Sequence, residues 1–202
     1  MTYNVSEFEK TEEQGAMIFG IGTAVCYLLF LLYDFNQVRW KSRKLHGAFA
    51  LSCAGLLPLT AAACWKGQNR NPARLVPGGI FALCFLLLLC YTLFFALPFE
   101  ETYVRESRGR RVCRTGMYAL CRHPGVLWYA GFYFSLYAAL GGAPLLVLAV
   151  TGTVLDLLYA VFQDVWTFPK TFCDYEEYRR EAPFLIPRPS SVVRCLRTLR
   201  KG

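Results

Sequence analysis

The sequence predicts an all-α membrane protein, a polytopic helical bundle with about five membrane segments that include a C-terminal helical hairpin. Only 18% of the 202 residues are charged, against roughly a quarter in soluble domains. Residues 14–33, 45–65, 75–99 and 124–155 contain no Asp, Glu, Lys or Arg at all. Because a bilayer core requires about 20 mainly apolar residues per helix, these stretches predict membrane helices.

The three N-terminal apolar stretches predict helices at about 14–34, 45–65 and 77–98. The first is not expected to be a signal peptide, since its N-terminal flank is acidic where a signal peptide is basic. The two connecting loops are basic and rich in turn-forming residues. Together these helices form a predicted N-terminal membrane region, residues 1–97.

The fourth apolar stretch is too long for one simple span. A Gly-Gly-Ala-Pro sequence at 141–144 breaks it, because glycine and proline together interrupt helices strongly. We expect a hairpin with arms at about 125–140 and 143–164, and a first arm roughly 24 Å long at 1.5 Å per residue. Residues 98–202 form the second predicted region, in which a cytoplasmic cap follows the hairpin.

Lys and Arg are unevenly distributed between the two sides of such a bundle. Counting alternate loops and tails gives 18 on one side and 4 on the other. The positive-inside rule then places the N-terminus outside and the C-terminal tail in the cytoplasm, and we expect the plasma membrane as the location. The net charge of +8 is explained by these loops, so no nucleic-acid partner is expected. The nine cysteines lack metal-ligand spacing, and no metal site is expected.

An Arg122-His123-Pro124 triplet lies at the N-terminal end of the fourth apolar stretch. From position alone it suits either a basic membrane-flanking loop, with the proline opening a helix, or a ligand site. Asp156 directly follows that stretch and is the one acid within the apolar part of the predicted second arm, and an intramembrane carboxylate is a candidate functional group. Helical spacing places Asp156 on the same side of its helix as three polar residues, which are Tyr159, Gln163 and Asp164.

Two motifs give the chain a resemblance to a known family. The segment G-M-Y-A-L-C-R-H-P at 116–124 resembles the G-x-Y-x-x-x-R-H-P signature of the isoprenylcysteine carboxyl methyltransferase and phospholipid methyltransferase superfamily. Downstream, F-C-D-Y-E-E-Y-R-R-E-A-P-F-L-I-P at 172–187 resembles that family's Y-x-x-Y segment and proline-containing tail. The likeness covers roughly residues 98–190.

The resemblance implies an S-adenosylmethionine-dependent methyltransferase whose lipophilic acceptor enters from the bilayer. Methyl transfer mainly requires alignment of donor and acceptor, without metal or covalent nucleophile. Arg122 and His123 are the catalytic candidates. The cofactor-binding candidates are Gly116, Tyr118, Arg122, His123, Pro124, Gln163 and Asp164. The acceptor-binding candidates are Trp128, Asp156, Tyr175, Tyr178 and Arg179.

The chain departs from the family pattern at four positions, which leaves alternatives open. The positions are Val126, Trp128, Gln163 and Asp164, the last two standing where paired glutamates are usual. A membrane NADPH-dependent reductase of the steroid-reductase type is one alternative, although its S-R-H-P-N-Y-x-G-E motif is matched less well. A non-catalytic membrane module of the same fold is the other.

Overall fold

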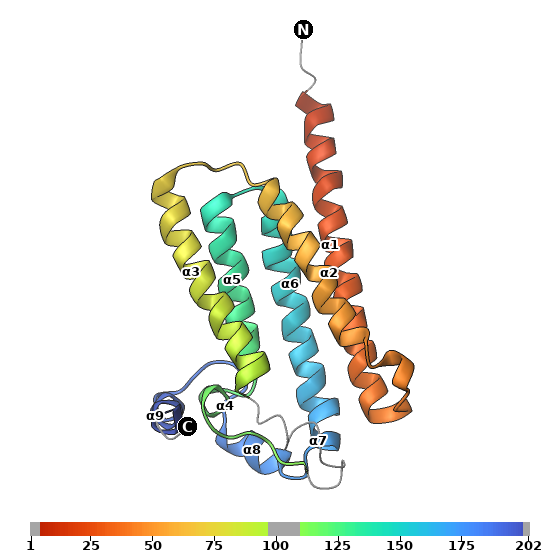
Figure 1. The fold of residues 1–202 in the computed structure, drawn as a ribbon, viewed down its shortest axis with the longest axis vertical. Helices are drawn as coiled ribbons and strands as arrows, with labels where there is room; N and C mark the ends of the chain where they lie inside the picture. The colour runs from red at the N-terminus through yellow and green to blue at the C-terminus, as the bar shows by residue number, and fades with distance from the viewer. Residues whose placement is uncertain (1–4, 97–109, 200–202) are drawn as a thin grey trace. The chain divides into compact units, whose positions relative to one another are not determined.

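The computed structural model describes residues 5–96 and 110–199, with side chains from residue 14 onward (Figure 1). Within these residues all regular structure is helical. The α-helices are α1 (Val5–Phe35), α2 (Ala48–Trp65), α3 (Pro72–Cys90), α4 (Met117–Leu120), α5 (Pro124–Leu140), α6 (Ala143–Phe162), α7 (Phe168–Thr171), α8 (Tyr175–Glu181) and α9 (Pro189–Leu199). Short π- or 3-10-helical turns are η1 (Asn36–Trp40), η2 (Arg43–Leu45), η3 (Tyr91–Phe95) and η5 (Gln163–Thr167). The predicted boundary at residues 97 and 98 lies outside the described part.

Four helical segments of the described chain are long and apolar enough to cross a membrane. They are Gln14–Trp40, Arg43–Trp65, Pro72–Phe95 and Ala143–Thr171. Helix α5 has 17 residues and is shorter than all four. The prediction of an all-α fold with several apolar helices of membrane-spanning length is confirmed for the described residues.

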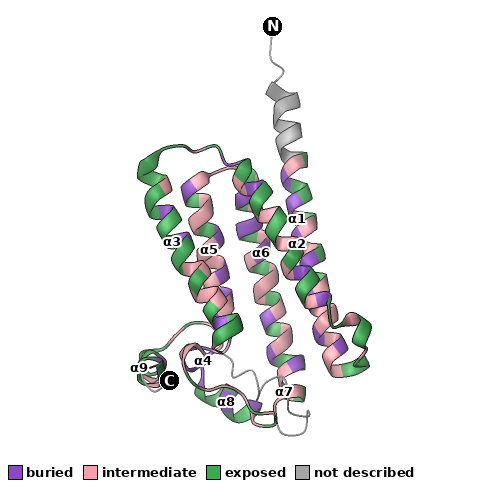
Figure 2. Cartoon of the chain, viewed as in Figure 1, coloured by how far each residue is buried: buried purple, intermediate pink, exposed green. Residues whose placement is uncertain are grey.

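Large apolar side chains on the outside of these helices support a lipid environment. Helix α3 is mostly exposed along its length in Figure 2. Its exposed residues include Val76, Ile80, Phe81, Leu83 and Leu87, each more than half accessible. Hydrocarbon tails would cover these side chains without the cost that water imposes.

The chain divides into two compact units, residues 1–84 with 130–159 and residues 85–129 with 160–202. In the first unit α1 and α2 lie side by side (Figure 1). Gly55 permits a close approach there, because a Cβ atom at this position would stand only 2.9 Å from the Cys26 sulfur. Ser52 donates a 2.6 Å hydrogen bond to the Cys26 carbonyl, which satisfies its hydroxyl in an apolar setting.

The predicted break within the fourth apolar stretch is present. Gly141 and Gly142 both have positive φ, 65° and 94°, and stand between α5 and α6. Asn69 fastens this turn, since its backbone N–H donates to the Leu140 carbonyl at 2.8 Å and its side-chain amide to the Ala139 carbonyl.

Three predicted helix boundaries differ from the structure. Helix α1 begins at Val5 rather than near residue 14, because a polar sequence without Gly or Pro can extend a helix beyond its apolar span. Helix α3 begins at Pro72, where the Asn71 side chain accepts the Ala73 N–H at 3.0 Å. The helix predicted at 143–164 continues beyond residue 164 through η5 and α7 to Thr171.

Candidate functional site

A buried ion pair links Arg122 of the first motif to Asp164 within the second unit. Nε of Arg122 lies 2.8 Å from Oδ1 of Asp164, and Nη2 donates to Oδ2 at 3.3 Å. The Nε–H is not aimed along a hydrogen bond, so that contact is mainly Coulombic. Nη1 donates to the carbonyls of Arg179 at 2.8 Å and Ala182 at 3.4 Å. The guanidinium is therefore held at both ends by protein groups.

His123 completes this centre beside the same carboxylate. Its Nε2 lies 3.3 Å from Asp164 Oδ1, and its side chain is only 5% exposed. Burial lowers the pKa of His123 below its usual 6.5, and the Asp164 carboxylate opposes this shift only in part. Arg122 also carries a positive charge nearby, which further disfavours the imidazolium form. The imidazole is therefore neutral at pH 7.

Tyr175 and Arg179 bring the second motif to Asp164. The Tyr175 hydroxyl donates to Oδ1, and Nε of Arg179 lies 3.5 Å from Oδ2. Burial, reinforced by the nearby carboxylate, raises the pKa of Tyr175, so its phenol stays protonated and remains a donor. Arg179 differs from Arg122 because its side chain is 42% exposed. We call Arg122, His123, Asp164, Tyr175 and Arg179 the Asp164 centre.

A π-helical turn places Asp164 in this centre. Helix α6 gives way to η5 at Gln163, whose carbonyl accepts the N–H of Phe168 five residues later. The wider turn rotates the following side chains relative to a regular α-helix, and such turns recur at functional sites. Gln163, a predicted cofactor ligand, opens this turn and is half-buried.

Backbone pairing and two aromatic rings enclose His123. The N–H groups of Arg122 and His123 donate to the carbonyls of Pro183 and Phe184 at 2.9 and 3.3 Å. The Phe168 ring stacks on the imidazole with centroids 5.7 Å apart and an interplanar angle of 8°. The Phe184 ring packs 5.0 Å from the imidazole and 5.6 Å from the Arg122 guanidinium carbon. The sequence analysis did not select Phe168 or Phe184.

Other predicted residues gather around Thr92 of η3, the turn that follows α3. The Tyr118 hydroxyl donates to the Thr92 carbonyl at 3.1 Å, and the Trp128 indole donates to the Thr92 hydroxyl at 3.1 Å. Tyr178 joins this group through its hydroxyl, which donates to the Tyr118 carbonyl at 2.7 Å. Thr92 is buried and was not predicted, because one threonine in an apolar run carries no sequence signal.

Gly116 and Pro124 have backbone roles in this structure. Gly116 has φ 58° and ψ −131°, a conformation that suits glycine alone, and it precedes α4. Its N–H donates to the Thr198 hydroxyl of α9 at 2.9 Å. Pro124 is fully buried and opens α5, where a missing N–H costs nothing.

Asp156 makes its contacts in the other unit. Its carboxylate is hydrogen-bonded to Tyr27 of α1, and Tyr159, one turn later, is hydrogen-bonded to Asp34. The Tyr159 ring also stacks on Phe30, with centroids 5.7 Å apart. Asp156 is thus tied to α1 by contacts of its own.

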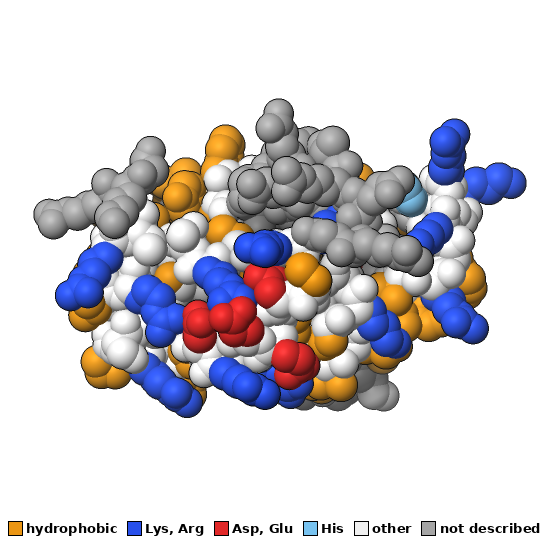
Figure 3. Space-filling model, turned by 90° about the horizontal axis from the view of Figure 1, so that it is seen from below, with side chains coloured by type: hydrophobic (Ala, Val, Ile, Leu, Met, Phe, Trp, Pro, Cys, Tyr) orange, Lys and Arg blue, Asp and Glu red, His pale blue; other side chains and the backbone are white. Residues whose placement is uncertain are grey.

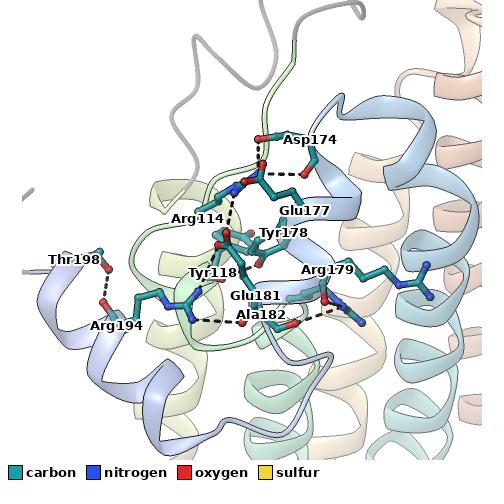
Figure 4. A network of polar contacts seen from close by, with 11 residues as sticks. Arg114, Tyr118, Asp174, Glu177, Tyr178, Arg179, Glu181, Ala182, Arg194 and Thr198 are labelled. Atoms are coloured by element: carbon teal, nitrogen blue, oxygen red, sulfur yellow. Dashed lines mark hydrogen bonds and ion pairs between the residues drawn. The ribbon is translucent and has the colours of Figure 1, made fainter.

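An ionic cluster around Arg114 holds α8 against the segment before α4 (Figure 4). The Arg114 guanidinium lies 3.1 Å from Asp174, 2.8 Å from Glu177 and 3.3 Å from Glu181. Hydrogen bonding to Glu177 raises the pKa of Arg114, and the same bond lowers the pKa of Glu177. Figure 3 shows the acidic side chains gathered on this face among basic ones. The cluster positions the helix that carries Tyr175 and Tyr178.

Comparisons of the chain with known protein families, with characterised proteins and with solved structures gave no match. The chemistry of the Asp164 centre therefore carries the functional proposal. Among its groups, Arg179 offers a partly exposed guanidinium, and the rings beside His123 are apolar. The Thr167 hydroxyl of η5 is buried without a hydrogen-bond partner among the described residues, so the turn that carries Asp164 also contains one unsatisfied polar atom.

Proposed function

We propose that this protein is an integral-membrane S-adenosylmethionine-dependent methyltransferase that acts on a lipophilic acceptor, an isoprenoid or lipid carboxylate or a lipid amine. The observation that carries the proposal is the Asp164 centre. It joins Arg122 and His123 of the first motif to Tyr175 and Arg179 of the second through a single buried carboxylate. Buried charge of this kind is costly, and its location at the end of a membrane segment favours a functional role.

The residues of the centre divide into positioning and binding groups under this proposal. Asp164 holds Arg122 and His123 in place, while Arg179, the most exposed charge of the centre, is the group available to a ligand carboxylate. The cofactor, when bound, supplies an electrophilic methyl group on a sulfonium. A primary or secondary amine acceptor loses a proton on methylation, and neutral His123 can accept it, whereas a carboxylate acceptor releases none.

The membrane arrangement proposed with this function has five segments and a C-terminal hairpin. Helix α5, with 17 residues at 1.5 Å per residue, is about 26 Å long and serves as the short fifth segment. The distribution of Lys and Arg supports an N-terminus outside and the Asp164 centre on the cytoplasmic side, in the plasma membrane.

A specific observation favours the non-catalytic module as second candidate. All three nitrogens of the Arg122 guanidinium contact protein oxygens, so this side chain needs no ligand to balance its charge. A protein that kept the fold for structural reasons would retain such a closed network.

Binding measurements on the full chain in lipid nanodiscs test the proposal. We expect wild-type protein to bind S-adenosylmethionine and Arg179→Ala to bind it at least about tenfold more weakly, a difference of 1.4 kcal/mol. Arg180→Ala is the matched control, because Arg180 is the exposed neighbour on α8, and its affinity should stay within about twofold of wild type. Absence of binding to wild type contradicts the proposal. Stabilisation by NADPH alone would instead indicate the reductase, and a response to neither cofactor the non-catalytic module.

The acceptor class is found by comparing lipid extracts. Cells with and without the protein should differ in lipids separated by the mass of one methylene unit. The chemical class of the heavier species then identifies the acceptor as a carboxylate or an amine.

A further inference from the structure

Apolar and polar side chains lie on different sides of helix α9, and the proposed function does not account for this arrangement. Its sequence is P-S-S-V-V-R-C-L-R-T-L. At 3.6 residues per turn, Val192, Leu196 and Leu199 follow one another along one side, and Val193 stands next to them. Arg197 and Ser190 lie on a neighbouring side. The helix is therefore amphipathic, with a continuous apolar edge.

A different side of α9 packs against the protein. Ser191 and Cys195 are buried, and the Thr198 hydroxyl accepts the Gly116 N–H at 2.9 Å. Helix α4 is the neighbour on this side, and a Cβ atom at Gly116 would meet Leu199 at 3.6 Å. The contacts that hold α9 thus leave most of its apolar edge uncovered.

The apolar edge is exposed among the described residues. Leu196 is 60% accessible, Val193 47%, Val192 38% and Leu199 37%. Figure 2 shows α9 largely in the exposed colour. Four neighbouring aliphatic side chains in water are unfavourable, so the edge requires a cover.

The neighbours of α9 indicate which surface covers this edge. Helix α4 packs on α9, and its Tyr118 donates to Thr92 near the end of the Pro72–Phe95 span. Helix α9 is therefore connected through α4 to the residues where a membrane-length span ends.

The charge of the C-terminal segment also indicates a membrane surface. Residues 182–202 contain five basic residues and no acidic one, and the basic residues are Arg188, Arg194, Arg197, Arg200 and Lys201. Arg194 is paired with Glu181 at 3.6 Å, whereas Arg197 is exposed beside the apolar edge. Basic side chains that flank an apolar helix edge are typical of helices lying on anionic membrane surfaces.

We propose that α9 is an interfacial helix that lies in the headgroup region of the membrane in which the protein is embedded. Its apolar edge inserts between lipids, and its basic side chains contact anionic headgroups. A binding surface for anionic lipid is thus part of the C-terminal segment, independent of the reaction that the Asp164 centre performs.

Tryptophan fluorescence in nanodiscs that hold one full-length chain tests this placement. The variant is Leu196→Trp on the apolar edge, and the control is Ser190→Trp, which lies about 120° round the helix from Leu196. Wild-type emission is subtracted to remove the native tryptophans. With brominated phosphatidylcholine we expect Leu196→Trp to be quenched at least twofold more than Ser190→Trp. Equal quenching of the two variants would overturn the proposal, as would a blue-shifted but unquenched Leu196→Trp, because protein would then cover the edge.

The proposed contact with anionic headgroups is tested separately, on protein without an added tryptophan. Replacing part of the phosphatidylcholine by phosphatidylglycerol should slow amide hydrogen exchange over residues 192–199 at least about twofold, and Arg197→Gln should reduce this effect. Exchange that does not change with phosphatidylglycerol would overturn the proposed contact with anionic lipid. Because this readout needs no cofactor, it is independent of whether the protein is a methyltransferase.

Discussion

Nε of Arg122 lies 2.8 Å from Oδ1 of Asp164, which joins residues 42 positions apart in the sequence. Both side chains are at most 9% exposed, so each charge depends on the other for its solvation. Removing one partner of a buried pair is far more costly than removing both, because the remaining charge is left uncompensated. The stability of the second unit should therefore depend on this contact.

The first prediction concerns Asp164→Ala. We expect it to lower the free energy of unfolding by about 3–5 kcal/mol, since Arg122 and His123 lose their shared carboxylate. Thermal unfolding of the purified protein in detergent micelles measures the change. Glu177→Ala is the matched control, because it removes an exposed carboxylate that is paired with Arg114, and it should change the unfolding midpoint much less. Similar losses for the two variants would contradict the prediction.

The second prediction is a pH dependence that originates in His123. Burial lowers the folded-state pKa of His123 below 6.5, so the unfolded chain binds more protons as the pH falls below that value. Stability should therefore fall as the pH is lowered from about 7 toward 5, with a slope of up to about 1.4 kcal/mol per pH unit from this residue. Above about pH 7.5 this contribution is constant.

Unfolding midpoints across this pH range test the assignment to His123. His123→Gln should flatten the dependence, whereas the same substitution at exposed His46 should leave it unchanged. A wild-type slope that persists in His123→Gln would show that another group titrates.

The sequence predicts those parts of the site whose residue types are unusual for their surroundings. Arg122 and His123 at the edge of an apolar run, and Asp164 on the polar side of the following arm, are expensive in membrane surroundings, and the family resemblance then made them ligand candidates. Tyr175 and Arg179 could be selected as site residues only through the second motif. In the structure these five residues form one centre.

Other parts of the site depend on geometry that periodicity does not encode. The π-turn at 163–167 adds one residue to a helical turn, so a regular 3.6-residue wheel misplaces the side chains that follow it. Phe184 reaches His123 through backbone pairing between segments about 60 residues apart. Asp156 was grouped with Asp164 by helical spacing, yet its hydrogen bond is to Tyr27.

The third prediction is that Cys121 is chemically inert despite its place beside Arg122. Its side chain is fully buried, and burial raises the pKa of its thiol from 9.0 to about 12. That shift alone leaves about a thousandfold less of the reactive thiolate. Exposed Cys173 is the internal comparison.

Alkylation of the folded protein at about pH 8, mapped by mass spectrometry, tests this expectation. Cys173 should be modified readily, and Cys121 only after the protein is unfolded. Modification of Cys121 in folded protein at a rate near that of Cys173 would mean that the 121–123 turn opens to solvent.

The fourth prediction compares alanine substitutions at two glycines, one with a positive φ and one in a regular helix. Gly116 has φ 58° and donates its N–H to Thr198, so Gly116→Ala should lower the free energy of unfolding by about 1–2 kcal/mol. Gly79 lies in α3, where a Cβ atom would meet nothing within 4 Å, and Gly79→Ala should leave stability unchanged or raise it by up to about 1 kcal/mol. Unfolding midpoints of the two variants measure the difference. Because Gly116 ties α4 to α9, its variant should also speed amide exchange in α9, and unchanged exchange there would mean that the 2.9 Å hydrogen bond does not hold the helix.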